Sequence, residues 1–200
     1  MSAQRRHTIG RPDDMHVHFR QDERMAAVVP FTARQFGRAI VMPNTQPYIC
    51  TVDEAAQYRD QIMAAVPSGV KFIPLMTLYL QTTMSPDTIR AAKQSGFIHG
   101  IKMYPAGATT NSDGGVKRVR DVEEQLRAME EVDMPLLIHG ESANPQDDVF
   151  MREDIFYGEA FAWLISTFPK LRMVCEHITT KTAVEMVKRA PEHLRLGAGF

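Results

Sequence analysis

The chain has 200 residues, of which 44% are hydrophobic and 24% are charged, so it has enough apolar material for one sizeable globular core. Its 23 basic and 24 acidic residues are interspersed and give a formal net charge of −1, which argues against a nucleic-acid or membrane partner. The only two cysteines, Cys50 and Cys175, fit a reducing compartment better than a disulfide framework. We expect one cytoplasmic domain over residues 1–200 whose partner is a small molecule.

Short apolar runs alternate with amphipathic stretches along the whole chain. Strands are predicted over residues 15–19, 39–42, 71–80, 100–104, 135–139 and 172–177. Helices are predicted between them, after the start signals at Thr51 and Ser85, over residues 119–132 and over residues 182–189. The last residues, LRLGAGF, at best begin a seventh strand.

This alternation predicts a parallel sheet with helices outside it, which is either a doubly wound sheet or a (β/α)₈ barrel. A doubly wound dinucleotide-binding sheet needs a glycine-rich phosphate loop, and neither G-x-G-x-x-G nor G-x-x-x-x-G-K-[ST] occurs. Polar residues instead close several different strands, as is typical of a barrel. They are His16, His18, Arg20, Asn44, Lys102, His139 and His177. The predicted fold class is therefore α/β, a (β/α)₈ TIM barrel of which this chain holds six to seven strands.

The run HVHFR predicts a group of polar side chains on one face of the first strand. Because residues two apart in a strand share a face, His16, His18 and Arg20 are expected to point the same way. Two imidazoles on one face can hold one metal ion, although a solvated edge strand would give the same pattern. The histidines that close PLLIH and MVCEH, His139 and His177, favour the metal over four separate structural histidines.

Lys102 lies inside the apolar strand GIKMY, where a charged ammonium is costly to bury. One explanation is that its side chain reaches the barrel rim or pairs with Glu141. The other is that burial keeps the amine neutral, so that it adds carbon dioxide and forms a carbamate that bridges two metal ions.

These motifs together resemble the bacterial-type dihydroorotases of the amidohydrolase superfamily over nearly the whole chain. The resemblance is carried by RPDDMHVHFR at 11–20, GRAIVMPNTQPY at 37–48, GIKMYPAGATTNSDGGV at 100–116, MPLLIHGE at 134–141 and CEHITTK at 175–181. It identifies the chain as the N-terminal portion of a metal-dependent hydrolase barrel. The activity that it implies is the reversible interconversion of dihydroorotate and carbamoyl aspartate in pyrimidine synthesis.

The resemblance also implies a role for each motif residue. His16 and His18 would bind one zinc ion, His139 and His177 a second, and carboxylated Lys102 would bridge the two. Arg20 and Asn44 would hold the substrate carboxylate, and Thr109 and Thr110 would lie in a mobile lid loop. A homodimer is expected of the complete protein.

The family's catalytic aspartate comes from the last barrel strand, and no aspartate of this chain stands in a matching position. Three interpretations remain: part of a longer dihydroorotase, a non-catalytic zinc-binding homologue that lacks the general base, or a hydantoinase-like cyclic amidohydrolase. Hydantoinase substrates do not require a carboxylate grip such as Arg20 with Asn44, which favours the first interpretation over the last.

Overall fold

The computed structural model describes residues 8–199, in which parallel strands alternate with helices. The strands are β1 (Asp13–Val17), β2 (Arg38–Val41), β3 (Ile73–Tyr79), β4 (Ile98–Met103), β5 (Leu136–His139), β6 (Met173–Glu176) and β7 (Leu196–Ala198). The α-helices are α1 (Asp22–Gln35), α2 (Val52–Ala65), α3 (Pro86–Gln94), α4 (Glu123–Glu131), α5 (Arg152–Phe156), α6 (Ala162–Thr167) and α7 (Lys181–Arg189). A 3₁₀ turn, η1 (Val119–Val122), precedes α4, and a π-helical turn, η2 (Tyr157–Phe161), joins α5 to α6.

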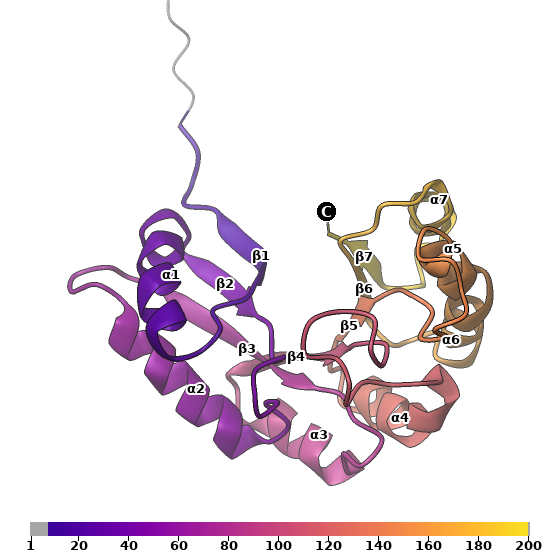
Figure 1. Ribbon diagram of the computed structural model, residues 1–200, viewed down its shortest axis with the longest axis horizontal. Coiled ribbons are helices and arrows are strands. Elements are labelled where there is room, and N and C mark those ends of the chain that lie inside the picture. The colour runs from indigo at the N-terminus through magenta and orange to yellow at the C-terminus, as the bar shows by residue number, and fades with distance from the viewer. Residues whose placement is uncertain (1–7, 200) are drawn as a thin grey trace, which may run out of the picture.

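The seven strands form one sheet in which each strand pairs in parallel with the next strand along the chain. Figure 1 shows these strands as an arc with the helices on its outer side and with β1 and β7 at its two ends. Sequential parallel pairing with a helical crossover at each step is the pattern of a (β/α)₈ barrel. The predicted fold class is confirmed as a seven-stranded parallel half-barrel.

Each of the six predicted strands overlaps an observed strand, and their ends differ by at most two residues. The seventh strand, which the sequence only hinted at, forms over three residues and pairs with β6. Two helical segments were not predicted: α1 and the continuous stretch from α5 to α6. Helix α1 forms although Pro30 lies inside it, because Met25, Val29 and Ala33 recur every four residues and bury one face.

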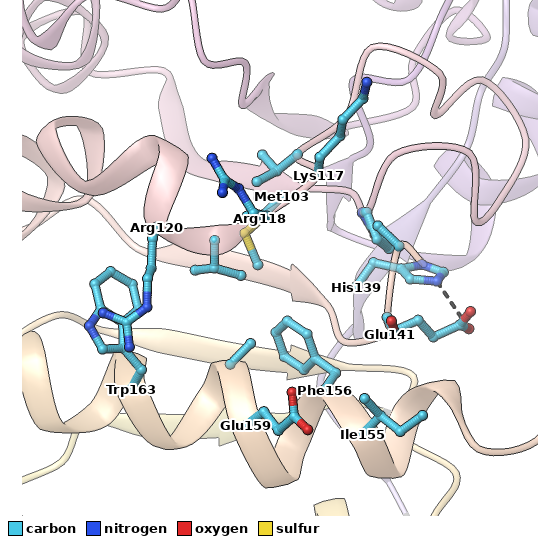
Figure 2. A pocket seen from close by; sticks show the side chains of 16 residues that line it. Met103, Lys117, Arg118, Arg120, His139, Glu141, Ile155, Phe156, Glu159 and Trp163 are labelled. Atoms are coloured by element: carbon cyan, nitrogen blue, oxygen red, sulfur yellow. Dashed lines mark ion pairs between the residues drawn. The ribbon is translucent and has the colours of Figure 1, made fainter. Parts of the chain in front are cut away.

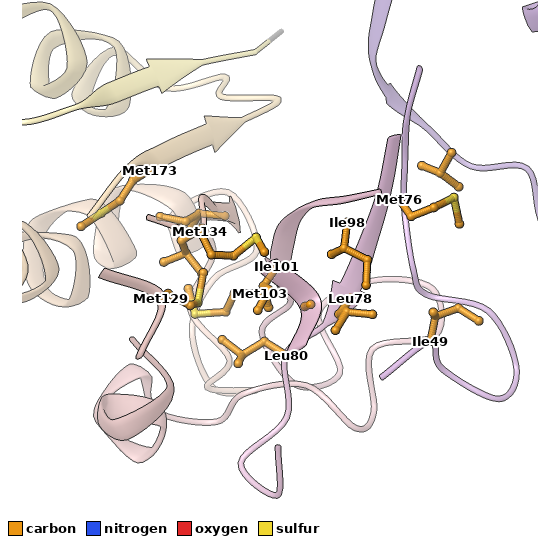
Figure 3. Close-up of a cluster of buried hydrophobic side chains, with 14 of the residues drawn as sticks. Ile49, Met76, Leu78, Leu80, Ile98, Ile101, Met103, Met129, Met134 and Met173 are labelled. Carbon is orange, nitrogen blue, oxygen red and sulfur yellow. The ribbon is translucent and has the colours of Figure 1, made fainter. Parts of the chain in front are cut away.

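The core lies between the sheet and the outer helices. Strand β3 shows why the apolar runs are nearly continuous, because consecutive residues from Met76 to Tyr79 are all buried, as expected of a parallel strand that is covered on both faces. Figure 3 shows part of this core, in which methionines fill space between branched aliphatic side chains. Within residues 8–199, no helix is long and apolar enough to cross a membrane.

The predicted helix starts have the expected chemistry. Thr51 accepts a hydrogen bond from the backbone N–H of Glu54, and the Glu54 carboxylate accepts one from the backbone N–H of Thr51. This capping box satisfies two N–H groups that the helix itself cannot bond. Ser85 and Thr180 cap α3 and α7 with one side-chain bond each.

Replacing Thr51 with alanine is expected to lower the free energy of unfolding by about 1 kcal/mol, because the N-terminal cap of α2 is lost. Urea denaturation followed by circular dichroism measures this change. Thr51→Ser keeps the hydroxyl and is the matched control, so an equal loss in both variants would contradict the capping role.

Candidate metal and substrate site

The two histidines of the HVHFR motif converge at the end of β1. The Nε2 atoms of His16 and His18 lie 3.1 Å apart, and their ring centroids lie 5.0 Å apart. Two nitrogens that share a tetrahedral zinc ion at about 2.0–2.1 Å lie roughly 3.3–3.4 Å from one another. The observed separation therefore fits a pair of imidazoles that bind one metal ion through Nε2.

Asn44 fixes the orientation of the second imidazole. Its Oδ1 lies 2.8 Å from His18 Nδ1, while its Nδ2 donates a 3.0 Å hydrogen bond to the carbonyl oxygen of Thr110. Because that carbonyl only accepts, the amide must present its oxygen to His18, and Nδ1 of His18 must carry the hydrogen. In the neutral ring this leaves the Nε2 lone pair facing His16.

His139 and His177 lie beside this pair. The His177 ring is 5.3 Å from the His16 ring and 4.6 Å from the His139 ring, measured between centroids. His177 follows the end of β6 with a positive φ of 41°, a sparsely populated conformation for a non-glycine residue that sets its side chain apart from strand alternation. Nε2 of His139 lies 3.1 Å from a Glu141 carboxylate oxygen, a contact that the dashed line marks in Figure 2 and that is an ion pair only when the imidazole is protonated.

Lys102 is fully buried in β4, and its ammonium contacts the carboxylate of Glu176, which is only 4% exposed at the end of β6. The alternative that Lys102 pairs with Glu141 or reaches the rim is therefore wrong, because Glu141 pairs with His139 instead. The other oxygen of Glu176 lies 3.2 Å from His16 Nδ1. One buried carboxylate thus contacts both the lysine and the first histidine.

Burial governs the protonation of the cluster. It lowers the pKa of His18 to about 4, with His16 and Arg20 adding to the effect, and it lowers the pKa values of His139 to about 3 and of His177 to about 4, with Lys102 adding to both. Burial also lowers the pKa of Lys102, although Glu176 opposes this change. These three imidazoles are therefore neutral at pH 7, the form in which histidine binds metals.

Arg20 and Asn44 line one pocket of about 550 Å³ together with Asn111. The strand alternation that predicts Arg20 on the histidine face does not reach this residue, because β1 ends at Val17 and Arg20 has a φ of 60°. This left-handed residue is held in place by Tyr58, whose hydroxyl donates a 2.7 Å hydrogen bond to its carbonyl oxygen. The pocket nevertheless presents a guanidinium and two amides, groups that can bind a carboxylate.

The loop of residues 105–116, which holds Thr109 and Thr110, is folded back on itself. The Ser112 hydroxyl bonds to both the N–H and the carbonyl oxygen of Thr109, and the backbone N–H of Gly107, which has a φ of 73°, bonds to the Ser112 carbonyl. The side chains of Thr109 and Thr110 are exposed. The Thr110 carbonyl connects this loop to Asn44 and hence to His18.

A second pocket of about 390 Å³ adjoins His139 and Glu141 (Figure 2). Its apolar wall includes Met103, Phe156 and Trp163, and three basic side chains border it: Lys117, Arg118 and Arg120. The Arg120 guanidinium lies 4.6 Å from the centre of the Trp163 ring. This pocket therefore combines apolar surface with positive charge next to one histidine of the cluster.

Two buried groups of the cluster were not among the predicted site residues. Glu176 stands in the quoted motif CEHITTK and, like Lys102, is an ionisable residue inside an apolar strand, so the same cost of burial could have marked it. Tyr104 is buried with a hydroxyl that has no hydrogen-bond partner among the described residues. The Lys102 ammonium lies 5.0 Å from the centre of its ring.

The comparisons with known proteins agree with the motifs. No protein-family model matches the chain. A dihydroorotase of Ralstonia pickettii (strain 12J) is 55% identical over 183 residues, which are 92% of this chain and 53% of that protein. Over this shared length, the chain belongs to the dihydroorotase family. It spans about half the length of the curated relatives it matches.

Solved dihydroorotases share the fold as well as the sequence. The enzyme of Campylobacter jejuni superposes with a TM-score of 0.84 at 38% identity, covering 94% of this chain and 53% of that one. The Saccharomyces cerevisiae dihydroorotase in complex with 5-fluoroorotic acid gives a TM-score of 0.85 at 32% identity, covering 94% and 55%. The half-barrel described above is therefore a dihydroorotase half-barrel.

The metal-free chain is expected to lose stability on acidification between about pH 6.5 and pH 4. An imidazole of the unfolded chain binds its proton near pH 6.5, whereas His18, His139 and His177 resist protonation until about pH 3–4. The unfolded state thus binds more protons in this window, so the free energy of unfolding rises with pH across it and reaches its full value above pH 6.5.

Urea denaturation at about pH 7.5 and about pH 5 measures this loss in the parent and in His177→Asn. The variant lacks one of the three suppressed imidazoles and should lose less stability on acidification. An equal loss in both proteins would contradict the assignment.

Proposed function

We propose that the protein of which this sequence is the dihydroorotase half-barrel interconverts dihydroorotate and carbamoyl aspartate at a binuclear zinc centre. His16 and His18 would bind one zinc ion and His139 and His177 the other, with carboxylated Lys102 between them. The observation that carries the proposal is the convergence of four imidazoles around a fully buried lysine in a chain that is 55% identical to a dihydroorotase.

The donor set fits zinc. Neutral imidazole nitrogens are common zinc ligands, and the 3.1 Å between the Nε2 atoms of His16 and His18 is close to the separation of roughly 3.3–3.4 Å that a shared ion requires. His16, Glu176 and His177 also present ligand atoms within 4.8 Å of one another. Zinc bound here would act as a Lewis acid toward the ring amide and would lower the pKa of a bound water.

The chain's own residues would prepare and orient the reactants. The Lys102 amine, freed of its proton, would form a C–N bond to carbon dioxide and release a second proton, giving a carbamate with two oxygen ligands. Arg20 would hold the substrate carboxylate with its planar fork, assisted by the amide groups of the same pocket. Asn44 would keep the lone pair of His18 directed at the metal.

Zinc content tests the centre directly. Elemental analysis of the metal-loaded 200-residue chain is expected to give close to two zinc ions per chain, and the double variant His16→Ala, His18→Ala is expected to lose at least one of them because it lacks two ligands. Circular dichroism shows whether the variant is folded. Equal zinc content in both proteins would show that His16 and His18 are not zinc ligands.

The role of Arg20 is tested in the complete protein. Arg20→Met is expected to raise the KM for dihydroorotate at least 100-fold, because a charged hydrogen-bonding pair with the carboxylate is lost. Competition by a cyclic amide without a carboxylate should change little between the two proteins. If Arg20→Met keeps the parent's KM for dihydroorotate, Arg20 does not hold the carboxylate. If the parent itself accepts the cyclic amide without a carboxylate as readily as dihydroorotate, a hydantoinase-type substrate becomes the better assignment.

A further inference from the structure

We propose that Glu176 positions His16 for metal binding by holding the hydrogen of the imidazole on Nδ1, while in the metal-free chain its second oxygen neutralises the Lys102 ammonium until that amine is carboxylated. The inference rests on the proposed metal centre and extends it to a residue outside the proposed ligand set. Two independent contacts support it, because the two carboxylate oxygens of Glu176 face different partners.

The two ring nitrogens of His16 face different groups, which distinguishes the nitrogen that would bind the metal ion from the one that faces Glu176. Nε2 of His16 faces Nε2 of His18 at 3.1 Å, whereas Glu176 Oε1 lies 3.2 Å from Nδ1, the other ring nitrogen. A metal ion shared by the two histidines through Nε2 therefore has Glu176 beyond the far nitrogen of the ring. The Nδ1–H is not well aligned with the carboxylate, but Nδ1 has no other polar partner within residues 8–199.

Both outer partners of the histidine pair accept hydrogen bonds. Asn44 Oδ1 takes the Nδ1 hydrogen of His18, and the ionised carboxylate of Glu176 offers only acceptor oxygens to His16. When both rings are neutral, each then directs a bare lone pair at the other across 3.1 Å. Two facing lone pairs repel one another unless a cation lies between them, so the two partners together create a site that favours a metal ion. A carboxylate on the outer nitrogen also makes the imidazole a stronger ligand.

The contact with Lys102 explains why a carboxylate rather than an amide serves His16. Lys102 is fully buried in the low-dielectric interior, and an unpaired ammonium there would be strongly destabilising. Asn44 bonds to His18 and to the Thr110 carbonyl, and a neutral amide suffices there. The negative charge of Glu176 thus compensates the ammonium of Lys102, and its position allows it to contact both Lys102 and His16.

Two measurements on the 200-residue chain test the proposal. Zinc affinity, from competition with a chromophoric chelator, is expected to fall 10-fold to 100-fold in Glu176→Gln, because the charged outer partner of His16 is lost. Exposed Glu192→Gln is the matched control and should bind zinc within about twofold of the parent. Glu176→Asp, which keeps the charge, should recover part of the loss.

The tautomer of His16 is read without metal from the ¹⁵N shifts of its imidazole. The parent is expected to carry its hydrogen on Nδ1, and the double variant Lys102→Met, Glu176→Leu, which leaves no buried charge unpaired, is expected to shift it to Nε2. Unchanged zinc affinity in Glu176→Gln, or an unchanged tautomer in the double variant, would reduce Glu176 to a charge partner of Lys102. A parent that binds no zinc would overturn the proposed function, while the tautomer measurement would still decide the role of Glu176.

Discussion

The contact between Lys102 and Glu176 is the constraint on which the concave side of the sheet depends. The two residues belong to β4 and β6, which are separated by β5, so their strands lie about two spacings of 4.7–4.9 Å apart in a flat sheet. Their side chains can meet over β5 only because both project from the concave face of a curved sheet. Burial makes each charge expensive alone, so the pair favours the curvature that brings the two together.

The same carboxylate connects this pair to the end of β1. His16 lies against Glu176, and the ring of His177 lies 5.3 Å from that of His16, so strands from both ends of the half-barrel contribute to one cluster. Burial raises the pKa of a carboxyl group, yet His16 and Lys102 together lower the pKa of Glu176 below its usual value. The cluster therefore combines one buried anion with the neutral imidazoles of His18, His139 and His177, an arrangement suited to a cationic ligand.

Sequence patterns predicted the strands and most of the cluster, because both depend on local signals. Parallel strands that are buried on both faces appear as apolar runs, and an ionisable residue inside such a run, such as Lys102, is conspicuous. Glu141 is the partner that the sequence suggested for Lys102, whereas the structure pairs Lys102 with Glu176, which lies in β6 and meets the lysine across β5. Strand alternation does not extend to Arg20, where a positive φ turns the backbone out of the strand pattern.

Asn44 gives the cluster a mechanical connection to the loop of residues 105–116. Its oxygen serves His18, its amide nitrogen serves the Thr110 carbonyl, and its own carbonyl accepts a 3.0 Å hydrogen bond from Asn111. Movement of the loop away from Asn44 would break two of these three bonds and leave a buried amide N–H without a partner, which is costly unless another acceptor replaces Thr110. A carboxylate in the pocket that Arg20 and Asn44 share would be such an acceptor. Exchange of the Thr110 carbonyl for a bound carboxylate would then release the loop, while His18 would keep its hydrogen bond to Asn44. The side chain of Asn44 would in this way couple the position of the loop to the occupancy of the pocket.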